Sequence, residues 1–241
     1  MLERIEKFQV TILSVVIAAA IVVAANTITS SISKDSIAVT GSYSQTVTSD
    51  SGRVEFEIAS RQPTKAQAYA IINQQRPEVI KYLENKGFKK EDIELKTPSG
   101  YNTYKVLPNG NSSNDIAYYN ISQSISVKSD DVKLIKDIAT ELPGLIEKGI
   151  DITVYEPSYF YSKLSEIKVQ MLEEATKDAK QRASAMLKAT HNRVGKIQSV
   201  KMGVFQVTPV DSNDVSDMGI SDTTSIEKKI TSVANVTFSV K

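Results

Sequence analysis

The 241-residue sequence contains no cysteine and no tryptophan, and His191 is its single histidine. Without cysteine, the chain has no disulfide, no thiol nucleophile and no thiolate metal ligand. One imidazole also excludes a site with several histidine ligands within one chain, and Ser–His catalysis would have to use His191. We therefore predict no catalytic residue, no cofactor and no metal site, and expect that the protein is not an enzyme.

The sequence also lacks an excess of charge of either sign. It has 29 Lys and Arg against 28 Asp and Glu, which gives a net charge of +1. Nucleic-acid binding requires a concentrated positive field, so nucleic acid is not an expected partner. With 41% hydrophobic and 24% charged residues, the composition is typical of a globular protein rather than a disordered one.

One long segment lacks charge altogether, from Phe8 to Ser33, and within it residues 15–25 are continuously apolar. A helix of about 18 residues is about 27 Å long, close to the hydrocarbon thickness of a bilayer. The segment therefore predicts a transmembrane anchor or a secretory signal. The side chains expected to contact lipid are Phe8, Leu13, Val15, Val16, Ile17, Ile21, Val22 and Val23.

Both interpretations of this segment stay open, and a buried core helix is a third, less favoured one. Val23-Ala24-Ala25 fits a signal cleavage site, whereas the short and barely positive residues 1–7 favour an uncleaved anchor. We expect residues 1–7 in the cytoplasm, 8–28 as anchor or signal, 29–35 as a linker and 36–241 as a periplasmic domain. The protein would then be a single-pass bacterial inner-membrane protein, or a soluble periplasmic one after cleavage.

Hydrophobic periodicity predicts alternating strands and helices over residues 36–241. A capping box at Thr64 and Gln67 begins the first helix, and Gly87 ends it. Helices are expected at 64–87, 129–149 and 163–190, and strands within 36–61 (two), then at 92–106, 116–128, 150–161, 194–207 and 230–240.

The element order from Val54 to Tyr161 is βαββαβ, which is typical of a ferredoxin-like sheet with helices on one face. The third helix carries alanines at four-residue spacing, Ala175, Ala179 and Ala183, which let a helix lie close to its neighbour. We predict one α+β domain with an antiparallel sheet, a βαββαβ core, an added long Ala-rich helix and C-terminal strands, preceded by the N-terminal transmembrane helix.

Two candidate sites are weak. His191 follows the third helix, where a histidine interacting with the helix dipole is favoured over a general base or metal ligand. The acidic segment 211–222 does not fit a calcium loop, because its fifth and sixth positions are Val215 and Ser216 and its twelfth is Asp222. A solvated loop is the favoured interpretation.

Tyrosines give the best indication of self-association. Tyrosine is amphipathic and common at interfaces, although ordinary sheet packing is an equally favoured explanation. The candidate oligomer interface consists of Tyr101, Tyr104, Tyr118, Tyr119, Tyr155, Tyr159 and Tyr161.

Several ordered segments of residues 36–241 resemble the SIMPL-domain (DUF541) family. They are Ile37–Gly41, Leu83–Phe88 with Asp92 and Ile93, Tyr119–Val127, the Ala-rich helix and Val194–Ile197. One departure is Ile226–Lys229, where the family often has Pro-Gly. The resemblance implies an exported α+β protein that assembles into ring-like or channel-like oligomers, with an envelope or oxidative-stress role and no defined enzymatic activity.

The expected function is therefore a membrane-anchored periplasmic scaffold whose partners are further copies of itself and the inner membrane. The alternative is a periplasmic ligand-binding module for an unidentified small molecule, without large assembly. That alternative requires an apolar cavity between the sheet and the third helix, with converging polar groups.

Overall fold

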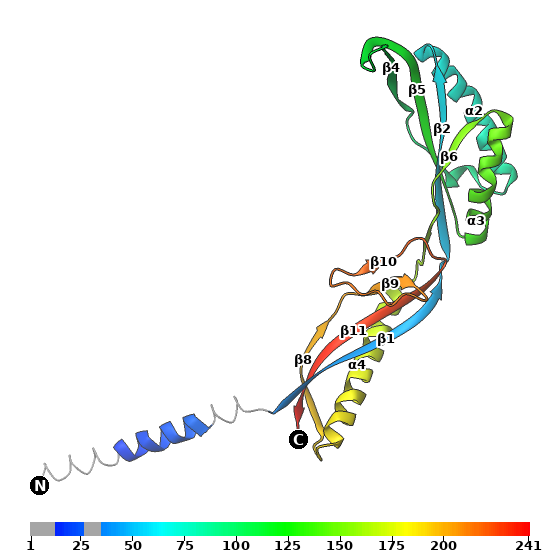
Figure 1. Ribbon diagram of the computed structural model, residues 1–241. Coiled ribbons are helices and arrows are strands. Elements are labelled where there is room, and N and C mark those ends of the chain that lie inside the picture. Colours follow the sequence, from blue (N-terminus) through cyan, green and yellow to red (C-terminus); the bar gives the residue numbers. More distant parts are fainter. Residues whose placement is uncertain (1–12, 27–34) are drawn as a thin grey trace, which may run out of the picture. The chain divides into compact units, whose positions relative to one another are not determined.

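The computed structural model describes residues 13–26 and 35–241 (Figure 1). Residues 13–26 form a helix that carries all the predicted lipid-facing side chains except Phe8, which lies outside the described residues. Within the described ranges, no helix combines the length and apolar character needed to cross a bilayer. The predicted transmembrane helix is thus not confirmed.

Residues 35–241 fall into two compact units. Unit 1 consists of residues 35–43, 170–204 and 232–241, and unit 2 consists of Ser44–Val169 and Phe205–Thr231. The boundaries lie inside three long elements, β1 (Ser36–Thr48), α4 (Leu164–Lys188) and β11 (Glu227–Val240). The sequence analysis predicted one domain over residues 36–241, and no break in a predicted element marks the boundaries between the two units.

Unit 2 contains a six-stranded antiparallel sheet with the order β3-β5-β2-β6, in which β4 also pairs with β5 and β7 with β2. The chain passes through β2, α2, β3 and β4, β5, α3 and β6, so the predicted βαββαβ order is present. The strands are β2 (Ser51–Gln62), β3 (Ile93–Leu95), β4 (Ser99–Val106), β5 (Ser112–Ser129), β6 (Asp151–Val154) and β7 (Ser158–Phe160).

Helices α2 (Lys65–Asn85) and α3 (Val132–Glu141) cover one face of this sheet (Figure 1). Alternate residues of β2 point into the core, so that Val54, Phe56 and Ile58 are fully buried. Because β2 and β5 pair antiparallel, Phe56 lies opposite Ile125 on the same face. The α+β class with antiparallel sheets is confirmed.

Both helical segments of unit 2 end in the same way. The amide of Gly87 donates to the carbonyl of Glu84 and that of Phe88 to Leu83, with Gly87 at φ 104°. Gly149, at φ 81°, and Ile150 repeat this pattern after the second segment. This is a Schellman motif, in which glycine adopts the left-handed conformation and the next apolar residue packs inward.

Prolines divide several predicted elements. The expected helix 129–149 begins after its N-cap Asp131 and leaves α-helical geometry at Leu142, next to Pro143, continuing as the 3₁₀ segment η2 (Leu142–Lys148). The expected strand 92–106 separates into β3 and β4 around Pro98, preceded by a 3₁₀ turn η1 (Lys90–Asp92). The expected strand 150–161 likewise separates into β6 and β7 around Pro157.

The second sheet has the order β1-β11-β9-β10, and β8 pairs with β11. Its remaining strands are β8 (Val194–Met202), β9 (Gln206–Pro209) and the short β10 (Ile220–Ser221), which is parallel to β9. Strand β11 pairs with β9 through its first half, inside unit 2, and with β8 through its second half, inside unit 1. The predicted strand 194–207 is therefore two strands, separated at Gly203 to Phe205.

In unit 1 the alanine face of α4 packs directly on β1 and β11, as the alanine spacing predicted. Ala175, Ala179 and Ala183 are fully buried. A Cβ atom at Gly41 would overlap the carbonyl oxygen of Ala175 and the backbone of Ala179, so only glycine permits this approach. The carboxylate of Asp178 accepts a 2.8 Å hydrogen bond from the amide of Ser42 and fixes the same contact.

Candidate functional site

Strand β8 of unit 1 is an edge strand whose apolar side chains are uncovered. It pairs with β11 and, in the part of the chain that the structure describes, has no strand on its other side. The register sets Ile197 opposite Phe238, Val200 opposite Val236 and Met202 opposite Ala234. These three β8 side chains are 52%, 46% and 62% exposed, whereas their partners on β11 are buried.

The position of α4 explains this contrast. Directly opposed residues of antiparallel strands share a face, so the three β8 side chains lie on the face that α4 covers over β11. The apolar cluster under α4 contains residues of β1 and β11, and from β8 only Val194 joins it. The close contact at Gly41 places α4 over β1. The helix therefore does not pack against Ile197, Val200 and Met202. We call these three residues the β8 apolar strip.

The tyrosines do not form one surface. Tyr101, Tyr104 and Tyr118 are exposed on the β4–β5 hairpin, and Tyr101 is the most exposed at 71%. The guanidinium of Arg61 lies 4.1 Å from the centre of the Tyr118 ring, in cation–π contact. Tyr155 lies at β6, on the opposite side of β2 from β5, and its hydroxyl donates to Glu57 at 3.1 Å.

The remaining three tyrosines of the predicted interface are less available. Tyr159 is 6% exposed within the core of unit 2, and Tyr119 packs partly buried against the same core. Tyr161 is partly buried just after β7. Tyr159 and Tyr119 therefore take part in the packing of unit 2, and the exposed members of the predicted interface are Tyr101, Tyr104, Tyr118 and Tyr155.

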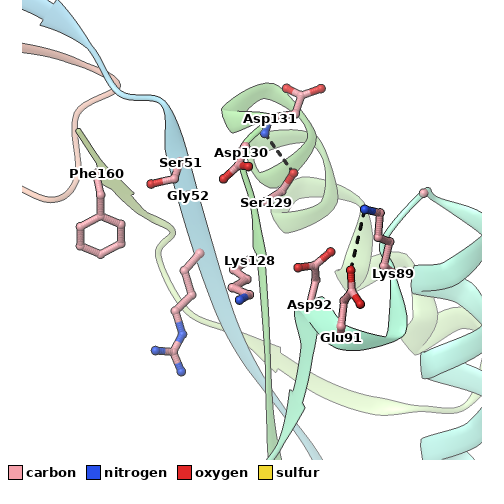
Figure 2. Close-up of a pocket in the computed structure, with 12 residues that line it drawn as sticks. Ser51, Gly52, Lys89, Glu91, Asp92, Lys128, Ser129, Asp130, Asp131 and Phe160 are labelled. Atoms are coloured by element: carbon pink, nitrogen blue, oxygen red, sulfur yellow. Dashed lines mark hydrogen bonds and ion pairs between the residues drawn. The ribbon is translucent and has the colours of Figure 1, made fainter. Parts of the chain in front are cut away.

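Unit 2 also has an open cavity of about 640 Å³ between the turn η1, the end of β5 and the start of α3 (Figure 2). Its charged side chains have both signs: Lys89 pairs with Glu91 at 3.8 Å, and Asp92 and Asp130 lie close by. The lining is polar, and no residue of α4 contributes to it. This cavity is therefore not the apolar one that the ligand-binding alternative requires.

The backbone of His191 helps to end α4. Within the described residues, His191 is the one residue other than glycine with a left-handed backbone conformation, at φ 60°. The amide of Asn192 then donates to the carbonyl of Leu187, which closes the helix end. Among residues 13–26 and 35–241, no cluster of three His, Asp or Glu side chains suits a metal ion.

The acidic segment 211–222 is mostly loop, but the side chain of its last residue is buried. The Asp222 side chain is 7% exposed and contacts the side chain of Lys228 on β11, which is 2% exposed. Sequence reasoning missed this pair. A signal existed, because Lys228 has the same parity along β11 as the buried residues Ile230, Ala234 and Phe238.

The fold and its surfaces define a mixed α+β protein with antiparallel sheets and an apolar edge. Comparison with protein families then places the chain. The family model described as SIMPL, a protein of unknown function (DUF541), matches residues 37–239. The chain belongs to this SIMPL family, as its ordered segments suggested. Among curated proteins, none matches the chain.

Proposed function

We propose that this protein is a self-assembling scaffold of the bacterial cell envelope, tethered to the inner membrane by its N-terminal segment. In this proposal its copies associate through the β8 apolar strip and the unpaired edge of β8. The envelope and stress role that the family resemblance implied belongs to the same proposal.

The observation that carries the proposal is the β8 apolar strip. Exposed edge strands with apolar side chains pair with other chains unless charge, proline or a covering element protects them. Among the described residues, α4 packs against Val194 of this strand but not against the β8 apolar strip, and the strand contains no proline. Of its two lysines, Lys196 and Lys201, Lys201 pairs with Asn235 on the face opposite the strip. A second copy of the chain would satisfy both the unpaired backbone groups and the three apolar side chains.

The sheet offers a suitable partner edge in unit 1, because β1 is the strand at its other side. Contact between β8 of one copy and β1 of the next joins two different surfaces and is heterologous. Heterologous contacts generate rings when the rotation between copies closes. Copies held on one membrane would also meet at a raised effective concentration, which favours assembly without additional contacts.

Mass photometry of the full-length protein in detergent tests the proposal. We expect the wild type to form oligomers at micromolar concentration and an Ile197→Glu/Val200→Glu variant to be monomeric, because buried carboxylates at this contact would be unpaired. Ser199→Glu is the matched control, since Ser199 is exposed and pairs with Thr237 on the other face. A monomeric wild type would contradict the scaffold proposal and favour the alternative of a ligand-binding module.

A further inference from the structure

Unit 2 contains a second, smaller cavity that the scaffold proposal does not use. It has a volume of about 130 Å³ and lies beside the first residue of α4, Leu164. Its apolar walls come from Tyr159, Phe160, Val207 and Ile230, and the amine-bearing side chain of Lys228 also lines it. A volume of this size holds about four water molecules, or a molecule of three or four carbon atoms.

The Lys228 ammonium group has only weak ionic support. Its shortest hydrogen bond, 2.8 Å, goes to the backbone carbonyl of Asp222, and the nearer carboxylate oxygen Oδ2 is 3.4 Å away. The other carboxylate oxygen, Oδ1, accepts three hydrogen bonds, from the amide and hydroxyl of Thr224 and from the amide of Ser225. The carboxylate is thus mainly committed to the turn after β10.

The acid–base properties of the pair agree with this geometry. Burial lowers the pKa of Lys228, and the Asp222 carboxylate offsets only part of that effect. Burial alone would raise the pKa of Asp222, but the hydrogen bonds from Thr224 and Ser225, with the charge of Lys228, hold it at about 2. Asp222 therefore stays ionised, while Lys228 loses its proton more readily than an exposed lysine.

We infer that Lys228 is a reactive amine whose cavity binds small aldehydes or ketones and holds them as a reversible imine. A desolvated lysine in an apolar pocket is the usual form of an activated amine nucleophile. After the ammonium loses a proton to water, the nitrogen lone pair forms a C–N bond and the carbonyl π electrons move to oxygen. The two remaining amine protons leave with that oxygen as water, so no oxidant or reductant is needed.

The reaction of the full-length protein with propanal and cyanoborohydride at neutral pH tests this inference, because reduction traps the imine as a stable propyl amine. Peptide mass mapping then gives the rate of modification at each lysine. Lys229 is the matched internal control, since it is the next residue of β11 and its Nζ donates to the carbonyl of Ser212 outside this cavity. We expect Lys228 to be modified several-fold faster than Lys229.

A bulkier aldehyde, 2-naphthaldehyde, tests whether the cavity selects its ligand. It should modify Lys229 faster than Lys228, which reverses the order expected with propanal. Partial unfolding would expose both residues equally and does not produce this reversal. The inference is overturned if propanal modifies Lys228 no faster than Lys229, or if Lys228 is the faster residue with both aldehydes. Assembly of the protein is a separate readout, so failure of this site leaves the scaffold proposal unaffected.

Discussion

The two units of this protein bury different kinds of side chain. Unit 2 packs large residues such as Phe56, Ile125 and Leu83 beneath two helices, whereas unit 1 packs the alanines of one helix against β1 and β11. Large apolar side chains contribute about 1.5–3 kcal/mol each on burial, and alanine contributes much less. Unit 2 therefore has the larger apolar core, while unit 1 depends on close backbone approach and leaves one strand of its sheet uncovered.

The largest effect is expected in unit 2. Phe56→Ala removes a fully buried ring from the centre of β2, and we expect a loss of about 3–5 kcal/mol in the free energy of unfolding. Denaturant unfolding followed by far-UV circular dichroism measures it. A loss below about 1 kcal/mol would mean that packing in the core of unit 2 contributes little to the free energy of unfolding.

The next effect concerns the close contact in unit 1. Gly41→Ala places a methyl group against the backbone of α4, and we expect a loss of about 1–3 kcal/mol. Amide exchange should accelerate in β1 and α4 and stay unchanged in β2. Gly144→Ala is the control, because a Cβ there meets no atom within 4 Å. Equal behaviour of the two variants would contradict the close-packing account.

Acid should weaken unit 2 through Asp222. Its folded-state pKa of about 2 lies below the ordinary value of 3.8, so its contribution is present above the unfolded pKa and is lost as pH falls toward 2. The shift corresponds to about 2 kcal/mol at 1.36 kcal/mol per pKa unit. Chemical denaturation at several pH values from 5 to 2 gives the free energy of unfolding as a function of pH. This free energy should fall less steeply with acid in Asp222→Asn than in the wild type, and equal pH dependence in the two proteins would refute this assignment.

The smallest effect is expected from removing the hydrogen bond between α4 and β1. Asp178→Ala removes the acceptor of the Ser42 amide and of the Arg182 guanidinium. A hydrogen bond to a charged group contributes about 1.5–3 kcal/mol, and partial exposure of Asp178 places the expected loss near 1 kcal/mol. Thermal unfolding measures this loss, with exposed Lys180→Ala as the control. Identical melting temperatures for the two variants would show that the hydrogen bond is dispensable.

Local sequence signals predicted the local features well. The Thr64–Gln67 cap is present, with the Gln67 amide donating to Thr64 at 3.3 Å. The glycines at 87 and 149 end their helical segments, and the alanine spacing of α4 marks its buried face. Each of these features depends on residues within a few positions of one another, which a single sequence contains.

Long-range pairing was not predictable in the same way. Period-two alternation predicts that β11 is a strand. No sequence pattern within β11 indicates that its two halves pair with β9 and β8 in different units. The exposure of the β8 apolar strip depends on the contact between β1, near Gly41, and α4. The residues that meet there are more than 130 positions apart in the sequence. Strand alternation also places Lys228 inward, but a buried lysine requires a partner, and the sequence alone does not identify Asp222 as that partner.

Hydrogen exchange of the full-length protein over a dilution series tests most directly whether the uncovered edge of unit 1 is completed by a second copy. Amides of β8 are expected to exchange more slowly as concentration rises, because assembly pairs the edge, while amides of β2 exchange at a constant rate. Exchange in β8 that is independent of concentration across the micromolar range would contradict the account.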